Sequence, residues 1–221
     1  PIVLEWPAAN QHATKFQTLY KSAKDGSAQG VAIRRLRDHD FQYCPSCGEA
    51  GSPNTLDHYL PKEKYPHFSA TLANLTPMCS RCQSKKSDHV GNAEHSRFFI
   101  HPYFDEFART QLLRLDINPP FDAPAFDLRV CDEVPADARP IVEQHFNRLE
   151  LPQRFRKFFR DRYRQLLRQA NDCREEAVDL QGFLRITRLN HSRVALNYWD
   201  HVFYLSVSGN AGLLAYLENE H

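Results

Sequence analysis

The 221-residue sequence lacks any apolar run close to the roughly 18 residues that a membrane-spanning helix needs. Its first twelve residues, PIVLEWPAANQH, lack the basic region and following apolar stretch of a signal peptide. A disulfide framework is missing too, because four of the six cysteines form two close pairs at a spacing typical of metal ligands. Cysteine usage of this kind indicates a reducing compartment, and we expect a cytoplasmic protein.

Excess charge of one sign is also missing. The formal net charge is only +1, and 42% hydrophobic with 25% charged residues is the balance of a globular protein that can bury a core. Positive charge is concentrated in residues 145–170, where eight Lys or Arg residues face two acids. Phe155, Phe158 and Phe159 interleave with this run and are expected on the core side of an amphipathic helix. Its basic side is either a solvated face or a contact surface for a phosphate backbone.

The pattern along the chain divides it into four stretches and shows no internal repeat. Residues 1–40 are expected to be helical, with a glycine-containing turn near DGSAQG. Residues 41–95 form a module of cysteines, histidines and turn formers. Residues 96–135 carry LLRLDI and FDLRV on either side of NPPFDAPA, which predicts a short β-hairpin and a linker. Residues 136–221 are expected to be a helical C-terminal region, so the fold class is α+β.

Two Cys-x-x-Cys pairs are the most specific feature of the sequence. Cys44 and Cys47 form the first pair, and Cys79 and Cys82 form the second. A two-residue gap lets both thiolates of a pair face one ion, and four cysteines are a preferred ligand set of structural zinc. Such a site has no open position for a substrate, so we expect the zinc to stabilise the fold without taking part in chemistry. The long separation between the pairs predicts a substantial insertion between them.

The insertion resembles the HNH endonuclease family, in particular its members with a four-cysteine zinc site. The resemblance covers about residues 41–90, and it rests on Asp57-His58 with Pro61, Asn74-Leu75, Pro77, the pair Cys79 and Cys82, and Lys86. It implies a zinc-bound ββα-metal HNH module, embedded here in a mostly α-helical chain. The following FIHPYFDEF looks similar to nucleases of bacterial anti-phage systems.

The chemistry of phosphodiester hydrolysis suits these residue types. The reaction needs a base that activates water and a cation that stabilises charge on the phosphate and the leaving oxygen. Imidazole titrates near neutral pH, and a carboxylate is a hard oxygen ligand suited to Mg²⁺ or Mn²⁺. The resemblance implies that His58 is the base, that Asp57 is the metal ligand, and that Asn74 orients the base or its loop.

The sequence departs from the family pattern at position 83. His or Asn commonly follows the final cysteine there as the second metal ligand, but this chain has Gln83. The glutamine could bind the catalytic metal directly, bind it through water, or have lost the role. Asp88 or His89 could substitute for it if the following helix turns them inward. Lys86 is either a phosphate contact or an exposed side chain.

These features predict a metal-dependent HNH endonuclease that hydrolyses DNA, and the likeness to anti-phage nucleases suggests a nuclease effector of a bacterial defence system. The expected cofactors are structural Zn²⁺ and catalytic Mg²⁺ or Mn²⁺. DNA is the expected partner, and the C-terminal region could dock a regulatory protein such as an ATPase or form an oligomer. The alternative is a non-catalytic zinc module that binds nucleic acid or protein, with an active site degenerate at Gln83.

Overall fold

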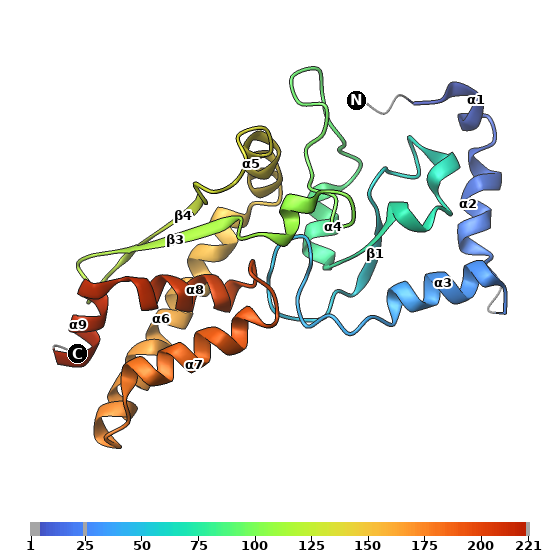
Figure 1. Cartoon of the computed structure of the whole chain (residues 1–221). Helices are drawn as coiled ribbons and strands as arrows, with labels where there is room; N and C mark the ends of the chain where they lie inside the picture. Colours follow the sequence, from blue (N-terminus) through green and yellow to red (C-terminus); the bar gives the residue numbers. More distant parts are fainter. Residues whose placement is uncertain (1–4, 24–25, 220–221) are drawn as a thin grey trace. The chain divides into compact units, whose positions relative to one another are not determined.

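The computed structural model describes residues 5–23 and 26–219, and the chain divides into two compact units (Figure 1). Unit 1 holds the chain through Glu106 together with Pro140–Leu149, and unit 2 holds Phe107–Arg139 and the chain from Glu150 onward. In the described part of the chain, no helix combines the length and the apolar content needed to cross a lipid bilayer. The four predicted stretches are a finer division than these units, and their boundaries stay a prediction.

Among the described residues, the N-terminal part of unit 1 contains three helices. They are α1 (Pro7–Asn10), α2 (Ala13–Lys21) and α3 (Ala28–Arg37). Helix α3 begins at Ser27, whose side chain accepts a hydrogen bond from the N–H of Gly30 at 3.0 Å and so satisfies a free donor of the first turn. Helix α2 packs against the 3₁₀-helix η1, and α3 packs against the strands β1 and β2, described next.

A two-stranded sheet and a short helix make up the centre of unit 1. Strand β1 (Thr55–His58) pairs antiparallel with β2 (Leu75–Met78), and the connection between them holds η1 (Pro66–Phe68) and η2 (Leu72–Asn74). Helix α4 (Ser80–Lys86) follows β2 directly and packs on β1. This ββα arrangement, together with the mixed helix and sheet of the whole chain, confirms the predicted α+β class.

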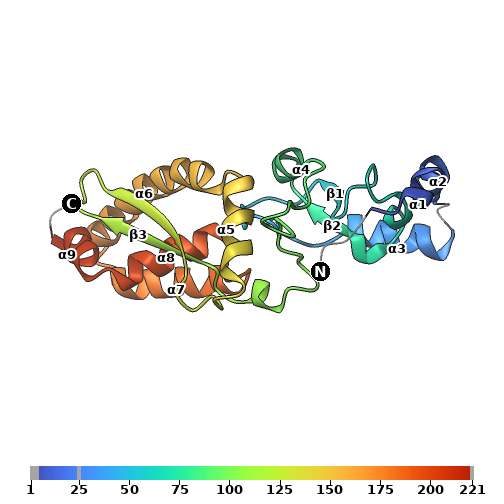
Figure 2. The same ribbon diagram turned by 90° about the horizontal axis from the view of Figure 1, so that it is seen from above.

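The described residues of unit 2 form a β-hairpin and four α-helices. Strands β3 (Leu113–Asn118) and β4 (Ala125–Val130) pair antiparallel at the two alternating runs of the sequence. The helices are α6 (Leu151–Glu175), α7 (Leu180–Ser192), α8 (Trp199–Gly209) and α9 (Ala211–Asn219). The hairpin packs on α8 through β3 and on α6 through β4, and both views show it running beside them (Figure 2).

Aromatic side chains form much of the core of unit 2. The ring centroid of Phe155 on α6 lies 4.0 Å from that of Trp199 on α8, and Phe159 stacks on Phe203 at 6.0 Å. All four are almost fully buried. The remaining elements, η3 (Glu106–Arg109) and α5 (Arg139–Arg148), each contribute residues to both units.

Candidate active site and cysteine cluster

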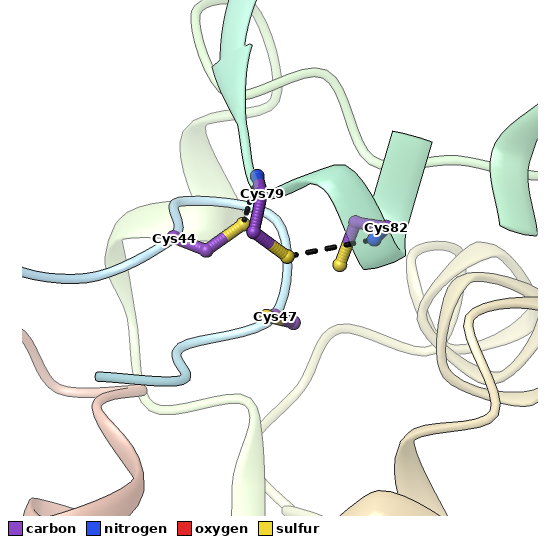
Figure 3. A group of neighbouring side chains, drawn as sticks. All are labelled: Cys44, Cys47, Cys79 and Cys82. Atoms are coloured by element: carbon purple, nitrogen blue, oxygen red, sulfur yellow. Dashed lines mark hydrogen bonds between the residues drawn. The ribbon is translucent and has the colours of Figure 1, made fainter. Parts of the chain in front are cut away.

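Four cysteine side chains from two segments of unit 1 converge on one point (Figure 3). The Sγ atoms of Cys44, Cys47, Cys79 and Cys82 all lie within 4.8 Å of one another. Tetrahedral zinc, with Zn–S bonds of about 2.3 Å, sets sulfur–sulfur distances of about 3.8 Å, so this cluster is compact enough to close on one ion. It is the only such group of three or more metal-ligating side chains among the described residues. The cluster could therefore hold a zinc ion, in agreement with the prediction.

Backbone N–H groups position the sulfurs. The carbonyl of Cys44 accepts hydrogen bonds from the N–H groups of Cys47 at 3.2 Å and Gly48 at 2.8 Å. The resulting turn requires φ of +76° at Gly48, in the left-handed region that favours glycine. The N–H of Cys79 donates to Sγ of Cys44, and the N–H of Cys82 donates to Sγ of Cys79 at the start of α4. Hydrogen bonds of this kind stabilise thiolates, the form that binds zinc.

The four thiols compete for protons. Hydrogen bonding with Cys44 lowers the pKa of Cys79, whereas hydrogen bonding with the same side chain raises the pKa of Cys47. A divalent cation resolves this competition because it binds all four sulfurs as thiolates. Burial of Cys44, Cys47 and Cys82 leaves no evident position for a substrate, which fits a structural ion.

The carboxylate of Asp57 forms an ion pair inside unit 1. In the pairing of β1 with β2, Asp57 lies opposite Thr76, and its Oδ2 lies 3.0 Å from Nζ of Lys86 on α4. Only 5% of Asp57 and 1% of Lys86 are exposed. The same ammonium donates to the carbonyl oxygen of His58 at 2.8 Å. Lys86 thus ties the end of α4 to the end of β1, and its predicted phosphate contact, which stays a prediction, would require it to leave this pair.

The imidazole of His58 has other neighbours. Its Nε2 lies 3.0 Å from the carbonyl oxygen of Ser69, and the ring of Tyr20 on α2 meets it edge-on at a centroid distance of 4.7 Å. Because a carbonyl oxygen only accepts, Nε2 must carry the hydrogen, and the neutral ring keeps its lone pair on Nδ1. Burial lowers the pKa of His58 below its ordinary value, which favours the neutral form near pH 7. This side chain can therefore act as a general base through Nδ1.

The side chain of Asn74 holds the loop that follows His58. Its Oδ1 accepts a hydrogen bond from the N–H of Leu60 at 2.7 Å, and its Nδ2 donates to the carbonyl oxygen of Leu60 at 3.0 Å. The same Nδ2 donates to the carbonyl oxygen of Phe68 at 3.2 Å. An amide suits this pattern, because it offers an acceptor oxygen and two N–H donors on one planar group. The role expected for Asn74, positioning the loop of the base, stays a prediction that this geometry supports.

The remaining candidate ligands lie on α4 and just after it. Gln83 is half-buried, one turn before Lys86. Asp88 is exposed and its Oδ2 lies 3.0 Å from Nζ of Lys64, while His89 is exposed with Nδ1 3.1 Å from the carbonyl oxygen of Lys86. Neither belongs to a metal-binding group in the described residues. Gln83 as a ligand of the catalytic metal stays a prediction.

A segment that the sequence did not assign to the site holds the backbone on either side of Asn74. We call residues 97–105 the strap. Within it, Tyr103 donates its hydroxyl hydrogen to the carbonyl oxygen of Leu75 at 2.9 Å, and Nε2 of His101 lies 3.1 Å from the carbonyl oxygen of Ala73. These two carbonyls flank Asn74 on either side along the chain. The strap therefore holds the backbone that presents the Asn74 amide.

An internal ion pair shapes the strap. The guanidinium of Arg97 binds both carboxylate oxygens of Asp105, at 2.6 and 2.7 Å, and the N–H of His101 donates to Asp105 Oδ2 at 2.7 Å. The alternation of His101, Tyr103 and Asp105 along the chain is the signal in the sequence that could have pointed to this segment. Tyr20 gave no signal, because its contact with His58 joins an N-terminal helix to a strand 38 residues later.

Helix α5 reaches the first cysteine pair from far along the chain. His145 is 4% exposed, its Nδ1 accepts a hydrogen bond from the N–H of Ile100 at 3.2 Å, and its Nε2 donates to the carbonyl oxygen of Ser46. Burial lowers the pKa of His145 to about 4, so it is neutral at physiological pH. This histidine joins the strap to the turn between Cys44 and Cys47.

Comparison with known proteins identifies the module. Residues 44–89 match the family model of the HNH endonucleases, which confirms the resemblance found at residues 41–90. The chain is 38% identical to Protein ea31 of Escherichia phage lambda over 63 residues. This alignment covers 28% of this chain and 21% of that protein. It is 31% identical to the Septu protein PtuB of Bacillus thuringiensis over 65 residues. This alignment covers 29% of this chain and 25% of that protein.

The matches cover only part of every chain involved. The aligned segment spans about a fifth of Protein ea31 and a quarter of PtuB. No solved structure gave a significant match to the chain. The family model therefore concerns residues 44–89 of unit 1.

Proposed function

We propose that this chain, whose residues 44–89 match the HNH endonuclease family, is a metal-dependent nuclease that hydrolyses DNA phosphodiester bonds. The observation that carries the proposal is the state of His58 at the end of β1. Its Nε2–H is held by the carbonyl of Ser69, so that Nδ1 keeps a lone pair for a proton. A buried, neutral imidazole of fixed tautomer is the group that activation of a water molecule requires.

In the proposed reaction, Nδ1 of His58 takes a proton from the water that attacks phosphorus, and the bond to the leaving oxygen breaks. Asp57 and Gln83 would hold Mg²⁺ or Mn²⁺, which supplies positive charge for the phosphate and the leaving oxygen. The donor set fits such an ion, because a carboxylate and an amide carbonyl are hard oxygen ligands. The ion would have to share Asp57 with the ammonium of Lys86.

Two neighbours would keep the base in place. The amide of Asn74 fixes the loop after His58 through both the N–H and the carbonyl of Leu60. The edge-on contact with the ring of Tyr20, at a centroid distance of 4.7 Å, limits rotation of the imidazole. A general base must remain within hydrogen-bond reach of the proton it removes, so these contacts serve catalysis through orientation.

A role in bacterial defence is part of the proposal. The likeness to PtuB, which bears the name of the Septu system, supports it. A nuclease that contacts mainly the phosphate backbone has little sequence specificity of its own. We therefore propose a cytoplasmic effector whose cutting depends on a regulatory partner such as an ATPase, with unit 2 as the docking or dimer-forming part.

The test is nicking of supercoiled plasmid DNA with Mg²⁺ or Mn²⁺, with the partner protein supplied where one is known. We expect His58→Ala to lower the rate by about 10²- to 10⁴-fold, the usual contribution of a general base. His12→Ala is the matched control, because His12 is exposed and lies outside the site. Equal cutting by the His58 and His12 variants would refute the assignment of the base.

A second candidate is a non-catalytic zinc module that binds nucleic acid or protein. The contact between Asp57 and Lys86 favours it, because this pair neutralises the carboxylate without a catalytic metal. This alternative predicts no Mn²⁺ binding by calorimetry that depends on Asp57, and no cutting under any condition. Mn²⁺ binding that disappears in Asp57→Asn would favour the nuclease.

A further inference from the structure

Helix α6 of unit 2 carries a row of cations on one face. We call this row the α6 stripe, and it consists of Arg156, Lys157, Arg160, Arg164 and Arg168, all of them exposed. At 3.6 residues per turn, the five side chains fall within an arc of about 120° around the helix axis. A second face of the helix holds Phe155, Phe159, Tyr163, Leu166, Ala170 and Cys173, all of them buried.

Most of the stripe has no acidic partner. Arg164 lies 3.3 Å from Asp161, an acid that borders the row. Arg162, which lies outside the stripe, is the cation of α6 that pairs with the buried Asp200, at 2.7 Å. In the described part of the chain, the other four stripe residues form no ion pair.

This arrangement is unfavourable for the isolated helix. Arg156, Arg160, Arg164 and Arg168 follow one another at i, i+4, and like charges at that spacing repel. The helix tolerates the repulsion because its other face packs into the aromatic core of unit 2, where Phe155 meets Trp199. An anionic ligand would relieve the repulsion, whereas a solvated face needs no such concentration of charge.

The geometry of the row suits a polyanion. From Arg156 to Arg168 the helix rises about 18 Å, and duplex DNA presents one negative charge per roughly 1.7 Å of its axis. A lipid surface is a poorer fit, because the apolar face of α6 is buried and cannot insert.

We propose that the α6 stripe binds the phosphate backbone of duplex DNA, as a contact surface separate from the HNH module. The choice of DNA over other polyanions rests on the proposed function. The stripe would raise affinity without reading sequence, because contacts to phosphate carry no base information.

The test measures binding apart from cutting. The 221-residue chain carrying His58→Ala is titrated, without added Mg²⁺ or Mn²⁺, against a labelled DNA duplex over a range of salt concentrations. The stripe variant adds R156Q, R160Q and R168Q, and Gln keeps nearly the same helix propensity as Arg. The matched control adds R185Q, R188Q and R193Q, which remove the same charge from α7 and its C-terminal end in the same unit.

The slope of log K against log salt is negative, and each lost phosphate contact reduces its magnitude by about 0.9. We therefore expect the magnitude of this slope to be smaller by up to about 2.7 in the stripe variant, and its affinity to fall at least ~10-fold at 100 mM salt. Both quantities should change little in the control. Circular dichroism and zinc content should stay equal in all three proteins. The proposal would be overturned if the stripe variant and the control lost equal DNA affinity, or if the stripe variant bound DNA as the parent does. Tight binding of an RNA duplex with no binding of DNA would also overturn it.

These outcomes are independent of the nuclease assignment. If the His58→Ala protein binds DNA through the stripe but the protein with His58 intact never cuts in the plasmid assay, the stripe proposal stands and the nuclease proposal fails. If the protein with His58 intact cuts but the stripe variant binds as the control does, the reverse holds.

Discussion

Removing the ammonium of Lys86 should destabilise unit 1 strongly, and removing its partner as well should restore most of the loss. The pair joins Nζ of Lys86 to Oδ2 of Asp57 at 3.0 Å, with exposures of 1% and 5%. Lys86→Met keeps the length of the side chain but leaves a buried carboxylate without its cation. Asp57→Asn with Lys86→Met leaves two neutral side chains of similar volume.

The distance sets the size of the effect. At 3.0 Å and an effective dielectric constant of about 20, the Coulomb attraction is about 5.5 kcal/mol, before the cost of desolvation. Loss of one partner from a buried pair typically costs about 3–5 kcal/mol. We expect that range for Lys86→Met and about 1–2 kcal/mol for the double variant, which still loses the hydrogen bond from Lys86 to the carbonyl of His58.

The assay should report on unit 1 alone. Hydrogen exchange of peptides from β1, β2 and α4, followed by mass spectrometry in increasing denaturant, measures the stability of that unit separately from unit 2. The single and double variants form a cycle with the parent, and we expect a coupling energy of at least about 2 kcal/mol. A double variant that is as unstable as Lys86→Met would refute this account of the pair. The double variant should stay inactive even when stable, because it lacks the carboxylate of Asp57.

Three further results are expected. Purified protein should contain about one zinc per chain, lost in Cys82→Ala, and a zinc-free parent would contradict the cluster assignment. The pKa of His145 is about 4 in the folded chain and about 6.5 in the unfolded chain, so the free energy of unfolding of unit 1 should be unaffected by this group above pH 6.5 and should fall by about 3 kcal/mol towards pH 4. In His145→Gln this pH dependence should disappear from the denaturation midpoints of unit 1, and an unchanged pH dependence would contradict the assignment. Asp105→Asn should lower the free energy of unfolding of unit 1 by about 1.5–3 kcal/mol, because it weakens the pair with Arg97. Nicking by this variant should slow, and full activity would exclude a positioning role for the strap.

Much of the candidate site could be predicted from short-range patterns. The spacing within the two cysteine pairs predicted a common ion, and the structure brings the four sulfurs together. The alternating runs near NPPFDAPA predicted the hairpin of β3 and β4, because side chains on a strand alternate between two faces. Such patterns are visible in a sequence because the residues that create them are neighbours in the chain.

The contacts of Lys86 and His145 could not be predicted in this way. Lys86 stands among exposed polar residues, and only the packing of α4 on β1 turns its ammonium inward. His145 binds the carbonyl of Ser46 across 99 residues of sequence, and nothing near either residue indicates the other. The interpretation of Lys86 as exposed failed because burial depends on which surface a helix meets.

The sequence by itself determined the chemistry available to this protein: four thiols for one ion, and an acid, an imidazole and an amide between them. Residue types and their spacing are enough for that, because ligand preference and acid–base behaviour belong to the side chains. Only the tertiary structure decided which nitrogen of His58 holds the proton, what neutralises Asp57, and which backbone groups Asn74 binds. Those properties depend on partners 6 to 29 residues away, which the folded chain alone brings within hydrogen-bond distance.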